Sequence, residues 1–232
     1  MLVLDAGNVL FGKEPSNSSQ GALQIQAMNL MGYDAMAWGE TDLAVSAEVL
    51  RERFAEAEFA ALSTNLGPAD ELPLQPYIFK EAAGHTIAIL GATAPAAAKR
   101  TQPGIALSVE PPLEAISRTV AGLRSQAEVI IVLSNLTADE NNALATQVPG
   151  IDIILGARGK GVKYGSRTLN GPDGPVVVAT TYRLGQFLGY LNVRFDNRGH
   201  VVSFAGQDLS LTDKYANDAE MLELLAPYGI KK

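Results

Sequence analysis

The sequence predicts a layered α/β domain, and three observations support this prediction. Apolar runs of strand length alternate with helical patterns along the 232 residues, an order typical of layered α/β proteins. The apolar runs are nearly continuous, as in strands whose sheet is covered on both faces. The hydrophobic content of 47% is enough for one sizeable core or two small ones.

The predicted strands follow these apolar runs in chain order. The strongest candidates are residues 2–5, 87–91, 129–133, 151–155 and 176–179. Two turn signals predict hairpins, one at residues 83–85 and one at residues 196–199 that joins residues 187–195 to 201–204. Residues 170–174 are rich in Gly, Asn, Pro and Asp, and we expect a loop there before the next strand.

Helical spacing is clear in two segments, and capping signals mark a third helix. Leu43, Ala47, Leu50 and Phe54 form one apolar stripe; Leu113, Ile116, Val120 and Leu123 form another, entered through Pro111 and Pro112. The run from Thr137 to Glu140 has the pattern of a capping box. A fourth helix is expected at residues 218–225.

Composition excludes several classes of function. The net charge of −7 and the absence of a basic run argue against nucleic-acid and anionic-membrane partners. The absence of cysteine excludes disulfides, zinc–thiolate sites and a cysteine nucleophile. No apolar stretch is long enough to span a membrane. The chain opens on an apolar strand with no signal-peptide features, so we expect either a cytoplasmic protein or an upstream segment that has been removed.

Eight segments together resemble the catalytic domain of 5′-nucleotidases and UDP-sugar hydrolases. They are residues 5–8, 31–39, 62–65, 76–80, 89–95, 131–136, 148–156 and 188–191. The resemblance implies a metallophosphoesterase (calcineurin-like) domain over residues 1–206, built as an α-β-β-α sandwich with mixed sheets. Residues 207–232 are then a peripheral tail.

The same resemblance implies a site for two metal ions, and it places the expected ligands on unsuitable residues. The bridging Asp falls on Asn8, and the Gly-Asn-His-Glu motif falls on Gly39 and the three residues after it, Glu40, Thr41 and Asp42. A third ligand, a His, falls on Asn135, and a Gly-His-x-His pair falls on Arg158 and Lys160. The family's first strand, with its Asp-x-His motif, has no counterpart. A neutral amide cannot balance two dications as a shared carboxylate does, and Arg and Lys do not ligate metals near neutral pH.

Each of these residues also has a simpler interpretation. Asn8 follows a strand and suits a turn, Thr41 or Asp42 can cap the helix that follows, and Asn135 can be a loop residue. Arg158 and Lys160 lie in a Gly-rich run that could be a solvated surface. The only two histidines, His85 and His200, fall at the two hairpin turns and are interpreted as turn residues.

These observations predict a degenerate, catalytically inactive relative with a binding or scaffold role and no cofactor. One alternative is a phosphoester hydrolase with a rebuilt single-metal site, in which Asn8, Glu40, Asp42 and Asn135 bind Mg²⁺ or Ca²⁺. Another is a metal-free module that binds an anion or nucleotide through Arg158, Lys160 and the amides of Asn8 and Asn135. We also expect Arg158 or Lys160 to pair with Glu40 or Asp42 in the vacated site.

The remaining expectations concern location and assembly. The resemblance implies a periplasmic or surface-anchored protein. The strand slot that has no counterpart here can be filled by an upstream segment, by another part of this chain, or by a second chain. A protein partner, a homo-oligomer and an anionic small molecule all remain open.

Overall fold

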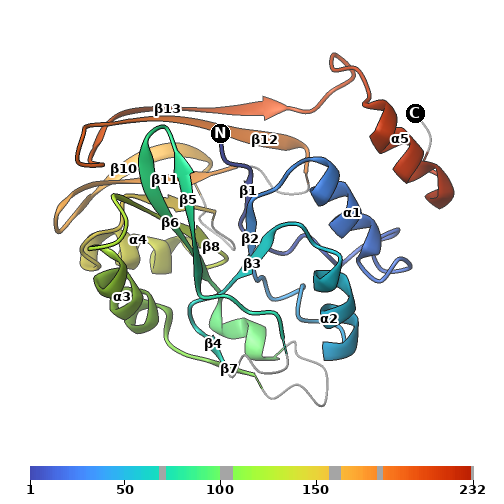
Figure 1. The fold of residues 1–232 in the computed structure, drawn as a ribbon, viewed down its shortest axis with the longest axis horizontal. Coiled ribbons are helices and arrows are strands. Elements are labelled where there is room, and N and C mark those ends of the chain that lie inside the picture. The colour runs from blue at the N-terminus through green and yellow to red at the C-terminus, as the bar shows by residue number, and fades with distance from the viewer. Residues whose placement is uncertain (68–71, 100–106, 157–162, 182–184, 231–232) are drawn as a thin grey trace.

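The computed structural model describes residues 1–67, 72–99, 107–156, 163–181 and 185–230. Within these residues the chain forms four layers, in the order helices, sheet, sheet, helices (Figure 1). The predicted α-β-β-α sandwich is confirmed.

The larger sheet has six strands in the order β10-β11-β9-β8-β6-β5. They are β5 (Tyr77–Ala82), β6 (His85–Ala92), β8 (Val129–Ser134), β9 (Ile153–Leu155), β10 (Gly165–Gly171) and β11 (Gly174–Thr180). The four inner strands are parallel, whereas the edge strands β5 and β10 pair antiparallel to their neighbours. The sheet is therefore mixed, as predicted.

Alternate residues of the inner strands face two different layers. In β8, Ile130 and Val132 pack against α3 (Pro112–Leu123) and α4 (Ala138–Gln147), while Ile131 and Leu133 pack toward the second sheet layer. Every position of β8 is buried. Cover on both faces explains why this strand is an unbroken apolar run.

The second sheet layer consists of two separate pieces. One is a parallel sheet of β1 (Leu4–Asp5), β2 (Ala35–Ala37) and β3 (Ala60–Leu62), and the other is the hairpin of β12 (Phe187–Phe195) and β13 (Val201–Ser210). Both pack on the same face of the larger sheet. Among the described strands, β1 pairs only with β2. The predicted domain boundary at residue 206 falls inside β13.

The outer helices of this layer are α1 (Ala22–Leu30) and α2 (Ala47–Ala55). Met36 and Trp38 point away from the larger sheet and pack with Ile25, Met28 and Leu50 from these helices. The chain also has a small pair of strands, β4 (Leu66–Gly67) and β7 (Ser108–Val109), and a peripheral helix, α5 (Ala219–Leu225), which contacts α1. Short 3₁₀ helices span Pro95–Lys99 and Ala226–Tyr228.

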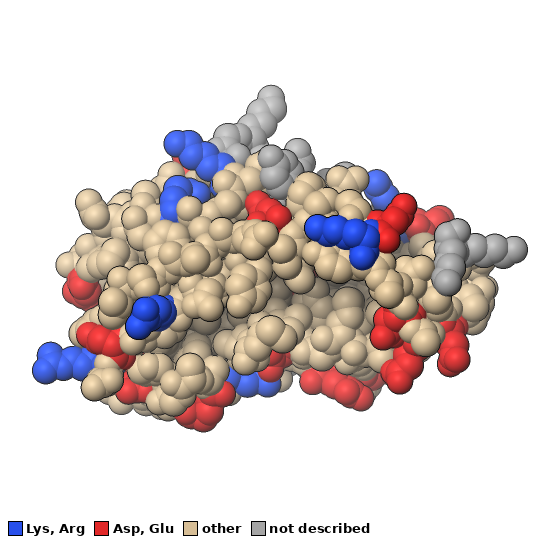
Figure 2. Space-filling view, turned by 90° about the horizontal axis from the view of Figure 1, so that it is seen from above, with Lys and Arg blue, Asp and Glu red and all other residues tan. Residues whose placement is uncertain are grey.

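Two further observations concern surface charge and helix length. Figure 2, seen from the β12–β13 side, shows no broad patch of Lys and Arg on the described residues of this face. Of the helices that the structure describes, none combines the length and apolarity needed to cross a bilayer.

Most of the predicted elements are present. The five strands, both hairpins and the Thr137 capping box are confirmed, and Asp218 caps α5. Three predictions need correction. Leu43 lies before α2 and is a buried loop residue. The expected loop at residues 170–174 is the tight turn of a hairpin, because Asn170 and Gly171 pair with Pro175 and Gly174. Neither Thr41 nor Asp42 caps α2, since the cap is Ser46, whose hydroxyl accepts the N–H of Val49.

Candidate functional site

The candidate site lies where the carboxyl ends of β1, β2 and β8 meet. The loop after β1 contains Gly7 and Asn8, and the loop after β2 contains Gly39 and Asp42. Asn135 follows β8, and its Nδ2 donates a hydrogen bond to the Ala6 carbonyl at 3.3 Å. The fold thus brings Asn8, Thr41, Asp42 and Asn135 to one edge of the sandwich.

Asp42 is fully buried and holds these loops together. Its Oδ2 accepts the N–H groups of Asn8 at 2.7 Å and Gly39 at 2.9 Å, and its Oδ1 accepts the N–H of Leu10 at 2.9 Å. Burial raises the pKa of Asp42, and the amide hydrogen bonds act in the opposite direction. Both carboxylate oxygens are therefore engaged by backbone amides.

Asn8 is also engaged by its neighbours. Its Oδ1 accepts hydrogen bonds from the Thr41 N–H at 2.9 Å and from the Thr41 hydroxyl at 3.0 Å. Its φ of 66° lies in the left-handed region, which Asn tolerates better than most residues. Gly39 packs against it so closely that a Cβ there would lie 2.3 Å from Asn8 Oδ1.

Asp5 belongs to the same cluster, although sequence reasoning did not single it out as a site residue. Its Oδ1 accepts the Gly7 N–H at 2.7 Å. Burial raises the pKa of Asp5 to about 7, the Gly7 hydrogen bond lowers it, and the negative charge of Asp42 raises it further. The only sequence signal was its position at the end of an apolar strand, directly before a Gly turn.

Among the predicted site residues that the structure describes, only Asn135 has an unused buried donor or acceptor atom. The residue is 4% exposed, and its Oδ1 has no hydrogen-bond partner within the described part of the chain. An unpaired buried carbonyl oxygen is costly, so such an atom calls for an explanation. Asn135 is thus not an ordinary surface loop residue.

Two other sets of polar residues beside the site have a structural role. Ser63, Asn65 and Thr93 form a buried network in which the Asn65 Oδ1 accepts the Thr93 N–H at 2.9 Å. Asn141 joins the hydroxyl of Ser134 to the carbonyl of Gly156. These contacts fix the loops after β3, β6, β8 and β9.

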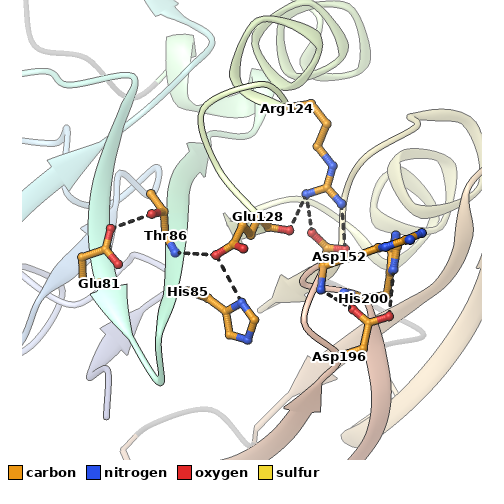
Figure 3. Close-up of polar contacts among 9 residues, drawn as sticks. Glu81, His85, Thr86, Arg124, Glu128, Asp152, Asp196 and His200 are labelled. Carbon is orange, nitrogen blue, oxygen red and sulfur yellow. Dashed lines mark hydrogen bonds and ion pairs between the residues drawn. The ribbon is translucent and has the colours of Figure 1, made fainter.

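The remaining candidate residues are Arg158, Lys160, Glu40 and the two histidines. Arg158 and Lys160 lie outside the described residues, so their expected pairing with Glu40 or Asp42 stays a prediction. Glu40 is half-buried. The two histidines lie elsewhere, because His85 begins β6 and His200 sits in the β12–β13 turn, both at the amino ends of β6 and β8 (Figure 3).

The site residues that the structure describes do not fit a two-metal centre. Such a centre needs a shared carboxylate and several imidazoles, whereas the atoms available at the bridging position belong to an amide already bound to Thr41. In the ranges that the structure describes, no three His, Cys, Asp or Glu residues are grouped so that they could hold a metal ion.

Comparisons with known proteins agree with this fold. No protein-family model matches the chain. It is 27% identical over 237 residues to the trifunctional nucleotide phosphoesterase protein YfkN of Bacillus subtilis, covering 86% of this chain and 16% of that protein. It is 27% identical over 253 residues to human 5′-nucleotidase, covering 100% of this chain and 44% of that protein. The chain thus spans less than half of either relative.

Solved structures give the same class. The 5′-nucleotidase precursor from Thermus thermophilus matches with a TM-score of 0.90 and 26% identity, covering 98% of this chain and 49% of that one. The crystal structure of the calcineurin-like phosphoesterase YfkN matches with a TM-score of 0.76 and 19% identity, covering 98% of this chain and 82% of that one. The fold is that of the calcineurin-like phosphoesterases. Within that class, the resemblance to 5′-nucleotidases predicted from the sequence is confirmed.

Proposed function

We propose that this chain is a 5′-nucleotidase-like domain that has lost two-metal catalysis and acts as a binding or scaffold module. The observation that carries the proposal is the network of Asn8, Thr41 and Asp42. Asn8 holds Thr41, and Asp42 holds three backbone amides, so the oxygens that would face metal ions instead stabilise their own loops.

The chemistry of the replaced positions supports the same proposal. Thr41 stands where the resembled family has its catalytic His, and a hydroxyl cannot protonate a leaving group as an imidazole does. Its hydroxyl is moreover donated to Asn8.

The test measures metal content and activity together. The purified chain is incubated with Mg²⁺, Mn²⁺, Zn²⁺ or Ca²⁺, freed of loose ions and analysed by mass spectrometry. Phosphate release from nucleoside monophosphates is then followed, because the relatives are named as nucleotidases. We expect substoichiometric metal and no release above the blank, with the Thermus enzyme as the active control. Near-stoichiometric metal with hydrolysis that a chelator abolishes would overturn the proposal.

One observation favours a second candidate, a rebuilt single-metal site. The Oδ1 of Asn135, which has no hydrogen-bond partner among the described residues, is an oxygen ligand of the kind that Mg²⁺ and Ca²⁺ accept. Against this, the oxygens of Asn8 and Asp42, which would complete the site with Glu40, already accept hydrogen bonds. Calorimetric titration with Ca²⁺ and Mg²⁺ decides: saturable binding that Asn135→Ala removes would establish this candidate, and no heat of binding would exclude it.

The metal-free anion or nucleotide module remains the third candidate and has its own assay. A nucleotide or sugar phosphate at a hundred times its dissociation constant should stabilise the fold by about 2.7 kcal/mol. A thermal shift of this kind, abolished by replacing Arg158 and Lys160 with Ala, would replace the scaffold proposal. No shift with any such anion would support it.

We also propose that the protein works outside the cytoplasm. The support is indirect: among its relatives are snake venom 5′-nucleotidases and a 5′-nucleotidase precursor. Fractionation of the source cells, with the protein detected by antibody, tests this. Recovery in the cytoplasmic fraction alone would contradict it.

A further inference from the structure

A second polar cluster lies at the end of the sandwich opposite the candidate functional site. Here a cavity of about 330 Å³ is lined by Thr86, residues 124–128, Arg198 and His200. These residues come from the start of β6, the loop between α3 and β8, and the β12–β13 turn (Figure 3). Both histidines of the chain belong to this region, His200 in the lining and His85 beside it.

The β12–β13 turn holds its two basic residues in a fixed arrangement. Asp196 Oδ1 accepts the N–H of Arg198 at 2.8 Å and of His200 at 2.9 Å, and Asp196 Oδ2 contacts His200 Nδ1 at 3.1 Å. These hydrogen bonds lower the pKa of Asp196 to about 2, so its carboxylate stays ionised near neutral pH. The turn is therefore organised without any ligand.

The β12–β13 turn packs closely against the loop of residues 124–128. Gly199 has a φ of 80°, and a Cβ there would lie 2.4 Å from the Glu128 carbonyl oxygen. The Phe195 ring stacks edge-on against His85 with centroids 5.6 Å apart. The wall that carries Arg198 and His200 is thus fixed relative to the wall formed by residues 124–128.

The charges of the cavity are unequally satisfied. Arg124 forms a two-pronged ion pair with Asp152, at 2.9 and 3.2 Å, and also donates to the Glu128 carbonyl (Figure 3). The Glu128 carboxylate is occupied on the other side, where its Oε2 accepts the Thr86 N–H and contacts His85 Nδ1, both at 3.2 Å. The Arg124 guanidinium is therefore already paired, and Glu128 keeps its Oε1 without a hydrogen bond or ion pair among the described residues.

Two exposed side chains of the lining carry hydrogen-bond donors that no other described residue uses. Within the described residues, the Arg198 guanidinium has no carboxylate within ion-pairing distance, and the Ser125 hydroxyl has no hydrogen-bond partner. His200 contacts Asp196 through Nδ1, which holds the ring against the turn. A guanidinium and a hydroxyl together suit the oxygens of a small anion.

We propose that this cavity is a binding site for a small oxyanion, held by Arg198 and Ser125. Its volume lies at the lower end of the range for small-molecule sites, so it suits an anion or the anionic group of a small molecule. The site is independent of the proposed function, because its lining shares no residue with the loops that carry Asn8 and Asn135.

The experiment is a titration of the whole chain with sodium sulfate at constant ionic strength, followed by the backbone amide signals in NMR. Sulfate is the probe because its charge does not change near neutral pH. We expect saturable shifts at Thr86, at residues 124–128 and at residues 198–200. Shifts that never saturate, or that centre on Asn8 and Asn135, would overturn the assignment.

Variants locate the binding groups. Arg198→Ala should weaken sulfate binding about tenfold, whereas Arg194→Ala, on an exposed position of β12, should leave it unchanged. Equal affinity in Arg198→Ala and the unaltered chain would refute the site.

A parallel titration with acetate shows whether the site prefers phosphate or sulfate groups or prefers carboxylates. Binding of sulfate without acetate assigns the site to phosphate or sulfate groups, and the reverse assigns it to carboxylates. Binding of neither overturns the proposal.

Discussion

Asn8 and Thr41 are joined by two hydrogen bonds that tie the loop after β1 to the loop after β2. Both end on the Asn8 Oδ1, at 2.9 Å from the Thr41 nitrogen and 3.0 Å from its hydroxyl. In the resembled family these two positions carry a metal-bridging carboxylate and a catalytic imidazole. Here they bind each other, which makes the site a structural junction.

Replacing Asn8 should reveal how much its hydrogen bonds and its backbone conformation each contribute to the free energy of unfolding. Asn8→Ala loses the acceptor for Thr41, worth about 1 kcal/mol, and puts a less tolerant residue at a φ of 66°, which costs about 1 kcal/mol more. Asn8→Gly loses only the hydrogen bonds and should be less destabilising. Urea unfolding of both variants checks this, and a Gly variant that is less stable than the Ala variant would contradict it.

Asp42 should be the most sensitive position of the site. Asp42→Ala leaves the buried amides of Asn8, Leu10 and Gly39 without their acceptor. Each unsatisfied amide costs about 1 to 3 kcal/mol, so we expect a loss of at least about 3 kcal/mol or failure to fold. The control is Asp213→Ala at an exposed position, which should change stability by less than about 0.5 kcal/mol. Similar unfolding midpoints for the two variants would show that Asp42 is not the anchor.

The elevated pKa of Asp5 predicts a pH-dependent effect. Its pKa is 3.8 in the unfolded chain and about 7 in the folded one, so the folded state binds this proton more tightly. The stability that the proton provides is complete below about pH 4 and is lost as the pH rises through about 7. Asp5→Asn keeps an acceptor for Gly7 and cannot ionise.

The variant should therefore match the unaltered chain at low pH and exceed it at about pH 8 by up to a few kcal/mol, at about 1.4 kcal/mol per pKa unit. Thermal melts across this range measure the difference. A constant difference at all pH values would argue that Asp5 does not carry the shifted proton.

Two glycines should respond to the same substitution with opposite signs. Gly91 lies where β6 crosses β3, and a Cβ there would be 2.0 Å from the Leu62 carbonyl oxygen. Gly91→Ala must push the two sheets apart locally and should cost about 3 kcal/mol or more. Gly122 lies near the end of α3 with open space around it, and Gly122→Ala should stabilise the chain by up to about 1 kcal/mol. Chemical denaturation of both variants tests the pair; a neutral Gly91→Ala would contradict the close approach.

Much of the fold could be predicted from the sequence because its signals are local. The apolar run of β8, the turn at Ala83 and Gly84, and the capping box at Thr137 each depend on residues adjacent in the chain. The short strands β2 and β3 and the helix α1 gave no comparable periodicity. Their stability comes from burial between layers, which depends on residues far away in the sequence.

The same distinction between local and long-range information applies to the candidate site. The sequence by itself determined the residue types at the positions where the resemblance implies metal ligands, and amides and a threonine stand at several of them. Only the tertiary structure decided what those residues do. Asp42 anchors three amides, Asn8 binds Thr41, the Asn135 Oδ1 has no partner among the described residues, and burial raises the pKa of Asp5 to about 7. The physical reason is that composition is a property of the chain, whereas burial and hydrogen-bond partners exist only after distant strand ends have come together.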